Sequence, residues 1–329
     1  MRRGRGYSPP MKLFYRAMLL ILAGLLFFFV AGIVAVWAPD KPLAELQARW
    51  AVPPSQFVAV GGMTVHLRDE GPRDDPVPIV LLHGTADSLF TWDGWTAQLH
   101  GERRVIRFDL PGFGLTGPAA SADYSIQAYL GFVAAVLDQL HLKTVVLGGN
   151  SLGGEIAWRF ALAMPQRVQQ LILVDAGGYP LAAQEVPLAI TVAGMPLLAP
   201  LLERLLPRGL VLAGLRNVYG DPSRVTPELV DRYYEMALRR GNCRALVQRL
   251  QAMEGDDSSA GIAALKLPTL IMWGALDRLN PVQAATRFSQ DIVGSRLVVF
   301  DGLGHLPQQE DPVRTIGEVR RFLGLAPQN

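Results

Sequence analysis

One serine of the chain stands in a setting that suits nucleophilic chemistry. Residues 149–153 (GNSLG) match the pattern G-x-S-x-G, between a strand-like run at 143–147 and a helical run at 155–164. A serine on a tight strand-to-helix turn is exposed, and glycines two residues to either side let neighbouring backbone approach. The N-terminus of the following helix then points at developing negative charge. This setting predicts that Ser151 is a nucleophile and that the match is not due to chance.

A serine hydroxyl is a weak nucleophile and needs a base. The sequence offers five histidines, and His305 follows the last strand-like run on a loop at the carboxyl edge of the expected sheet. His83 precedes a glycine and is assigned to shaping a loop. The other three lie within a strand or at helix ends: His66, His100 and His141. We therefore expect His305 to act as the general base.

The base in turn needs an acid that holds its tautomer and stabilises the imidazolium. Asp277 follows the strand-like run 270–273, so its loop lies at the same sheet edge as His305. Asp109 and Asp175 also end strands, and Asp175 is the rival acid. We favour Asp277 because its loop directly precedes the helix and strand that lead to His305. The resulting chain order is serine, aspartate, histidine.

These residues need a sheet that brings the ends of several strands together. From residue 56 onward, strand-like runs alternate with amphipathic helical runs, and most of the strands are apolar throughout, as in parallel strands covered on both faces. Two short runs around Gly61-Gly62 indicate a hairpin. The alternation predicts a doubly wound, mostly parallel α/β sheet. The expected strands are 56–60, 63–69, 78–82, 105–108, 145–147, 171–174, 270–273 and 297–300.

One long stretch interrupts the alternation. Residues 178–265 contain no convincing strand, and leucine-rich helical pieces stand at 196–206, 209–215 and 227–253. Ligands of open α/β sheets bind at the carboxyl edge of the strands. We interpret the stretch as a helical cap over this edge, with one apolar face on the sheet domain. Its composition predicts an apolar pocket above Ser151.

The first 55 residues have a different organisation. Residues 1–16 form a basic tail, 17–38 carry no charge, and 39–55 contain four prolines. As a helix, residues 17–38 would span about 33 Å, enough for a ~30 Å hydrocarbon core. A buried core helix is the first alternative, and a cleaved signal peptide is the second, although Pro39 follows the best small-residue pair. We expect a single transmembrane anchor followed by a stalk at 39–55.

The charge pattern orients this anchor and excludes other roles. Five basic residues precede it, so the positive-inside rule predicts a cytoplasmic N-terminus and places the α/β domain on the exoplasmic side. Without those five, the chain holds 26 basic and 29 acidic residues, so the pI of about 8.8 does not indicate nucleic-acid binding. The single cysteine, Cys243, excludes an internal disulfide and a cysteine-based zinc site. The sequence shows no metal, phosphate-loop or dinucleotide motif, so no cofactor is expected.

Several segments together resemble the α/β-hydrolase superfamily, in the branch with a helical cap between the sixth and seventh main strands. The segments are 82–85 (LHGT), 109–114 (DLPGFG), 149–154 (GNSLGG), 273–281 (WGALDRLNP) and 304–312 (GHLPQQEDP). The resemblance implies a catalytic core at 56–177 and 266–329, with the cap at 178–265.

The same resemblance implies roles for individual residues. It makes Ser151 the nucleophile, Asp277 the acid and His305 the base. The oxyanion hole would use the backbone N–H of Leu152 and a second N–H from the loop after the third strand, here Thr85. A serine nucleophile sets the chain apart from the related haloalkane dehalogenases and epoxide hydrolases, which use a carboxylate.

The function that follows is hydrolysis of a carboxylic ester of an apolar small molecule or lipid through an acyl-enzyme. The GNSLGG segment also resembles carbon–carbon bond hydrolases of ring-cleavage products, which usually place an arginine near the start of the cap; residues 177–185 contain none. Such a hydrolase, or a cofactor-free perhydrolase with the same triad, is the alternative. A third reading, a non-catalytic binding module on this fold, predicts an incomplete triad. The partners expected are the apolar substrate and the membrane, without nucleic acid.

Overall fold

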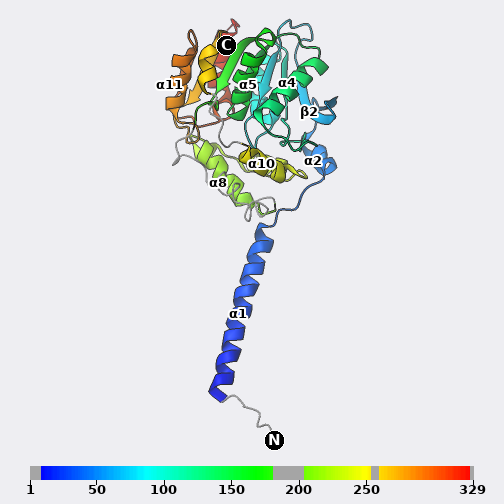
Figure 1. The fold of residues 1–329 in the computed structure, drawn as a ribbon, viewed down its shortest axis with the longest axis vertical. Coiled ribbons are helices and arrows are strands. Elements are labelled where there is room, and N and C mark those ends of the chain that lie inside the picture. The colour runs from blue at the N-terminus through cyan, green and yellow to red at the C-terminus, as the bar shows by residue number, and fades with distance from the viewer. Residues whose placement is uncertain (1–8, 181–203, 253–258, 327–329) are drawn as a thin grey trace.

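The computed structural model describes residues 9–180, 204–252 and 259–326, and Figure 1 shows a mixed α/β domain with one long helix projecting from it. The domain holds one eight-stranded sheet in the order β1-β2-β4-β3-β5-β6-β7-β8. Strand β2 pairs antiparallel with β1 and β4, and every other neighbouring pair is parallel. The strands are β1 (Gln56–Val60), β2 (Met63–Glu70), β3 (Ile79–Leu82), β4 (Val105–Phe108), β5 (Val145–Asn150), β6 (Val168–Val174), β7 (Thr269–Gly274) and β8 (Arg296–Phe300).

This arrangement confirms the expected mostly parallel α/β sheet, and each strand lies where the sequence predicts one. The central strands are mostly apolar because both of their faces are covered. In β3, for example, Val80 and Leu82 belong to one buried cluster, whereas Ile79 and Leu81 belong to another on the opposite face. Side chains of a strand alternate between faces, so a continuous apolar run supplies two cores at once.

Helices complete the two layers. The helices α4 (Ile126–Gln139), α5 (Leu152–Ala163) and α11 (Val282–Asp291) contribute to the first cluster. The helices α3 (Asp93–Leu99) and α13 (Pro312–Phe322) contribute to the second. Each of the two clusters is therefore closed by helices that come from different parts of the chain, as in other doubly wound sheets.

Between β6 and β7 the described residues form helices and no strand. These are α8 (Arg208–Val218), α9 (Pro227–Ala237) and α10 (Asn242–Gln251), and Figure 1 shows α8 and α10 together on the side of the domain from which the long helix extends. The expected piece at 227–253 is thus two helices, separated at Gly241, which has a φ of +88°. Most of the piece expected at 196–206 lies outside the described residues. The cap boundaries at 178 and 265 stay predictions.

The long helix α1 (Pro9–Val36) projects away from the domain (Figure 1). Its segment Leu13–Gly32 has 20 residues and a mean hydropathy of 2.3, so by length and composition it is a candidate membrane span. Core helices and signal sequences can share these properties, so the helix alone does not establish membrane crossing.

The segment 39–55, interpreted from sequence as a stalk, packs on the domain. It contains the helix α2 (Leu43–Trp50), and Lys41 pairs with the end of α9: its N–H donates to Leu238 O at 2.6 Å. Glu235 of α9 accepts hydrogen bonds from Trp50 Nε1 at 2.6 Å and from Arg49 Nη1 at 2.7 Å. The segment thereby connects α1 to the helices between β6 and β7.

Apolar packing also holds this segment. Leu46 of α2 is 1% exposed and belongs to a buried cluster with four residues of the domain: Leu89, Phe90, Leu115 and Met236. An eight-residue helix is stable only through tertiary contacts of this kind. Such contacts join residues that are distant in sequence, so the local sequence pattern did not predict the packing of α2.

The packing of α2 gives a first prediction. Leu46→Ala in the full chain should lower the free energy of unfolding by about 3 kcal/mol, because it removes buried methyl groups and leaves a cavity. Val52→Ala, a change at a 53%-exposed position of the same segment, is the matched control and should change stability by less than about 0.5 kcal/mol. Chemical denaturation in detergent measures the free energy of unfolding of both variants and of wild type. If Leu46→Ala is as stable as wild type, α2 is not held by this packing.

Candidate active site

Ser151 occupies a strained turn between β5 and α5. Its φ of +54° and ψ of −116° lie in a region that residues with a side chain rarely adopt. The strand runs through Asn150 and the helix starts at Leu152, so the serine itself is the whole connection. Its N–H donates to Val174 O of the neighbouring strand at 3.0 Å, which holds the turn in register with β6.

Two glycines make this turn possible. A Cβ atom added at Gly149 would lie 2.2 Å from the backbone of Gly153, and one added at Gly153 would lie 2.2 Å from Leu82 O. Either contact is far inside van der Waals distance, so a side chain at these positions would push the helix away from the sheet. The structure therefore accounts for the glycine spacing that singled out Ser151.

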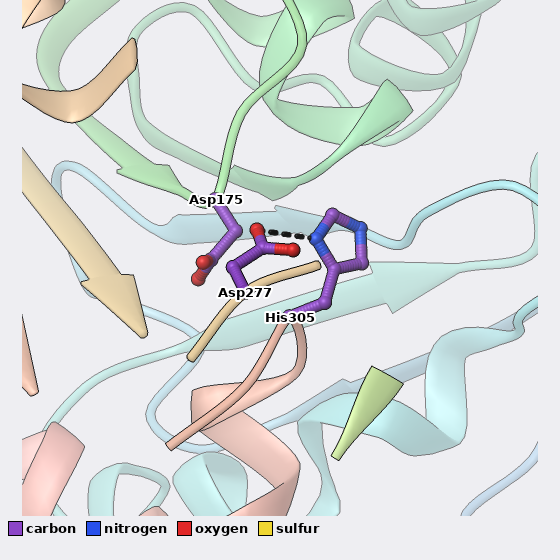
Figure 2. Close-up of side chains that lie close together, drawn as sticks. All are labelled: Asp175, Asp277 and His305. Carbon is purple, nitrogen blue, oxygen red and sulfur yellow. Dashed lines mark hydrogen bonds and ion pairs between the residues drawn. The ribbon is translucent and has the colours of Figure 1, made fainter. Parts of the chain in front are cut away.

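The structure brings His305 and Asp277 together. His305 follows β8, is 4% exposed, and its Nδ1 lies 2.7 Å from Oδ2 of Asp277 (Figure 2). An ionised carboxylate only accepts, so Nδ1 carries the hydrogen and Nε2 is the nitrogen able to accept a proton. Among the described residues the structure records no hydrogen bond from Ser151 to His305, although both line one cavity. Such bonds often tighten only when substrate binds.

Asp277 is held as an anion. Its Oδ1 accepts the N–H groups of Leu279 at 2.8 Å and Asn280 at 3.0 Å. Burial acts to raise the pKa of Asp277, but the charge and hydrogen bond of His305, with those donors, outweigh it and bring the pKa below the ordinary aspartate range. Asp277 is therefore suited to orient and stabilise a charged histidine.

Asp175, the rival acid, lies beside Asp277 and is not hydrogen-bonded to His305. It follows β6 with a φ of +44°, is fully buried, and its Oδ1 accepts the N–H of Gly274 at 3.0 Å. Burial, then the charge and hydrogen bond of Asp277, raise the pKa of Asp175 well above its ordinary value. The pKa values of the two acids are thus shifted in opposite directions, and the geometry favours Asp277 as the partner of His305.

The cavity that reaches Ser151 has a volume of about 480 Å³. Residues of α8, α9 and α10 line one side of it, and Ser151, His305 and the loop after β3 line the other. The described lining is mainly apolar and includes no lysine or arginine; its one carboxyl group is that of Asp87. The apolar lining from the cap includes Leu206, Leu210, Val211, Leu215, Met236, Leu246 and Leu250.

The two expected oxyanion donors belong to different elements. Leu152 is the first residue of α5, and Thr85 lines the cavity on the loop after β3. His83 holds this loop: its Nδ1 donates to Gly84 O at 2.7 Å, and its Nε2 accepts the N–H of Leu110 at 2.9 Å. The loop-shaping role expected for His83 thus has a physical basis, while the oxyanion roles of Leu152 and Thr85 stay predictions.

Two residues that position the site were not singled out by the sequence. Asn150 Nδ2 donates to His305 O at 3.0 Å and to Val174 O at 3.2 Å, which ties the histidine loop to the sheet. Glu310 accepts the N–H of Gly304 at 2.9 Å and that of Gly220 at 3.0 Å. The available signal for Asn150 was a polar side chain that ends an otherwise apolar, buried strand.

A hydrogen-bonded serine–histidine–aspartate set occurs outside the cavity. His66 Nδ1 lies 2.7 Å from Asp109 Oδ2, and its Nε2 lies 2.9 Å from Ser55 Oγ. Phe57 stacks on the His66 ring at 5.1 Å between ring centroids, and none of these residues lines the described cavity. This network anchors the end of the docked segment 39–55 to β2, and Ser55 provides a natural control for Ser151.

Comparisons with known proteins identify the family to which this fold belongs. The family described as the alpha/beta hydrolase fold matches residues 77–312. The chain belongs to the α/β-hydrolase family. A curated relative, the 2-hydroxy-6-oxo-2,4-heptadienoate hydrolase of Pseudomonas putida, is 30% identical over 277 residues, which cover 82% of this chain and 95% of the relative. The protein is therefore an enzyme of the hydrolase class.

Solved structures of other α/β hydrolases share the fold. A meta-cleavage product hydrolase is similar with a TM-score of 0.70 at 25% identity, covering 82% of this chain and 97% of the other. A thermophilic esterase from Thermogutta terrifontis has a TM-score of 0.67 at 27% identity, with 82% and 97% covered. Because both kinds of enzyme share this α/β-hydrolase fold, the fold alone does not choose a reaction.

The burial and raised pKa of Asp175 give a second prediction. If the folded chain keeps a proton on Asp175 that the unfolded chain releases above pH ~3.9, Asp175 contributes to the free energy of unfolding. This contribution is complete below pH ~3.9. It is lost as pH rises toward the raised pKa of the folded state, at up to about 1.4 kcal/mol per pH unit. Asp175→Asn cannot titrate, so its melting temperature relative to wild type should increase from pH 4 toward neutrality. A difference that stays constant with pH would show that Asp175 is ionised in the fold.

Proposed function

We propose that the protein is a serine hydrolase in which Ser151 is the nucleophile, His305 the base and Asp277 the acid. The observation that carries the proposal is that the strained turn of Ser151 lines the same cavity as His305. Nδ1 of His305 lies 2.7 Å from the buried carboxylate of Asp277. A strained backbone at a cavity, with a base held by an acid, is the arrangement that activates a serine.

The proton movements follow from this arrangement. As Ser151 Oγ attacks a carbonyl carbon, Nε2 of His305 accepts its proton, and the imidazolium is stabilised by the anion of Asp277. The negative charge that develops on the carbonyl oxygen is stabilised by the N–H groups of Leu152 and Thr85. His305 then donates the proton to the leaving group, and water activated by His305 releases the acyl group from Ser151.

Substitution of the nucleophile gives a third prediction. Ser151→Ala should lower kcat on a p-nitrophenyl ester by about 10⁴-fold or more and leave KM nearly unchanged. It should also abolish labelling by a fluorophosphonate probe. Ser55→Ala is the matched control, because Ser55 also contacts a histidine but lies outside the cavity lining, and it should keep labelling and activity. Labelling that survives in Ser151→Ala would remove Ser151 as the nucleophile.

The cavity supports an uncharged, apolar substrate. An acyl chain in contact with the cap residues gains up to about 0.8 kcal/mol per buried methylene. An anionic substrate would find no lysine or arginine in the described lining and would lie near the Asp87 carboxyl. This chemistry favours our proposal that the enzyme cleaves an ester with an apolar acyl group.

The relatives favour a second candidate. Two curated relatives are named 2-hydroxy-6-oxo-2,4-heptadienoate hydrolase and 2-hydroxymuconate semialdehyde hydrolase, each 30% identical over 82% of this chain. Their names fit carbon–carbon cleavage of ring-cleavage products better than ester cleavage. The same Ser151 and His305 would serve this reaction, so the two candidates differ in the substrate and not in the proposed triad.

A substrate series distinguishes the two candidates and is the fourth prediction. Across p-nitrophenyl esters with two to six acyl carbons, kcat/KM should rise by up to about fourfold per carbon and fall once the cavity is full. A 2-hydroxy-6-oxo dienoate should be a poor substrate. A flat or falling ester profile together with faster turnover of the dienoate would favour the carbon–carbon hydrolase instead.

We also propose that α1 anchors the enzyme in a membrane as a single span with its N-terminus in the cytoplasm. The support is the apolar segment Leu13–Gly32 and the basic residues that precede it in the sequence. The hydrolase domain then lies on the exoplasmic side. The contacts of Lys41 and Trp50 with α9 hold the domain close to the end of the span.

Membrane association gives the fifth prediction. The full chain should stay with membranes after alkaline carbonate extraction, whereas residues 39–329 should be soluble and active, because this deletion keeps Leu46 and the contacts of Glu235. Protease added to the outer face of the intact inner membrane should degrade the domain of the full chain. Protection of the domain until that membrane is lysed would reverse the proposed orientation.

A further inference from the structure

The carboxyl group of Asp175 is buried, touches the acid of the triad, and has no role in the mechanism described so far. One nitrogen of His305 and one carboxyl oxygen each of Asp175 and Asp277 lie within 4.8 Å of one another, and Figure 2 shows the three side chains converging from separate chain segments. One carboxyl oxygen of Asp175 lies within 4.8 Å of one of Asp277, and the buried Oδ2 of Asp175 has no donor among the described residues. A hydrogen bond between two carboxyl groups requires a proton on one of them.

The surrounding donors decide which acid holds that proton. Asp277 accepts two backbone N–H groups on Oδ1 and faces His305 with Oδ2, so its negative charge is well stabilised. Asp175 accepts one N–H, from Gly274, on Oδ1, and its buried Oδ2 accepts no N–H or O–H group from the part of the chain that the structure describes. An unpaired buried anion is costly, whereas a protonated Oδ2 has an acceptor in Asp277.

The other charged group that acts on Asp175 is consistent with this assignment. Glu310 raises the pKa of Asp175 through its negative charge, and its own oxygens accept the backbone N–H groups of Gly220, Asp221 and Gly304. The backbone of Asp175 is also fixed, because Asn280 Nδ2 donates to its carbonyl oxygen at 2.8 Å. The side chain is thus held in place independently of the proton it carries.

Resting on the proposed triad, we propose that Asp175 is a positioning residue: as a neutral acid it donates a hydrogen bond to Asp277 and holds that carboxylate against His305. The bond also withdraws negative charge from Asp277. Without it, the more concentrated charge on Asp277 would stabilise the imidazolium further. The acid limb of the pH–rate profile therefore tests whether Asp175 donates this bond.

Two kinds of substitution separate this role from others. Asp175→Asn keeps a neutral donor of the same shape, and asparagine tolerates a positive φ. Asp175→Ala removes the donor, and Asp175→Gly removes it without backbone strain if the alanine variant fails to fold. The acid limb of kcat/KM on p-nitrophenyl butyrate, and kcat and KM separately, are measured between pH 5 and 9.

The asparagine variant should keep kcat within about threefold of wild type and keep the acid limb in place. The alanine or glycine variant should lose about tenfold in kcat, a loss that corresponds to one hydrogen bond to a charged group, with KM unchanged and the acid limb raised. An acid limb lowered by about one pH unit in Asp175→Asn would show that Asp175 is an anion and overturn the proposal. An unchanged limb in the alanine and glycine variants would also overturn it.

A measurement without substrate tests the role of Asp175 independently of the proposed reaction. The titration of His305 is followed by NMR of ¹⁵N-labelled histidine in the Ser151→Ala background, with and without each Asp175 substitution. The His305 pKa should rise in the alanine or glycine variant and stay the same in the asparagine variant. If catalysis fails in wild type but these shifts occur, the proposed reaction is wrong and the role of Asp175 still holds.

Discussion

The site depends on one backbone constraint, the positive φ of Ser151 between β5 and α5. The constraint holds only because Gly149 and Gly153 let the turn, the helix and β3 approach to distances that no side chain permits. The same close approach brings the start of α5 next to the end of β3 and Gly84 next to Ser151. The packing of the sheet and α5 therefore stabilises the strained backbone of Ser151 at the surface of the cavity.

The polar groups behind Ser151 come from several loops that hydrogen bonds hold together. His305 and Asp277 come from separate loops, and Asn150 ties the histidine loop to the sheet through the carbonyl of His305. In front of the serine the environment is the opposite, since the cap helices contribute mainly apolar side chains. A polar network behind and an apolar cavity in front suit a reaction in which charge develops at the carbonyl oxygen while an apolar chain binds.

Much of this architecture could be predicted because it depends on local sequence patterns. The eight strands follow from apolar runs, and Ser151, Asp277 and His305 each follow a strand in the order expected for this fold. The roles of Asn150 and Asp175 were not predictable, because they depend on which loops meet above the sheet. The packing of the segment 39–55 was missed for the same reason: Leu46 is buried by residues that are distant in sequence, and its prolines indicated only a stalk.

The most direct measurement of the central claim is a crystal structure of the enzyme after reaction with a butylphosphonate ester. The account predicts a covalent bond from Ser151 Oγ to phosphorus, with the phosphonyl oxygen hydrogen-bonded to the N–H groups of Leu152 and Thr85. The butyl chain should lie among the apolar residues of α8 and α10 that line the cavity. A phosphonyl oxygen held by other donors, or an adduct on a different residue, would contradict the account.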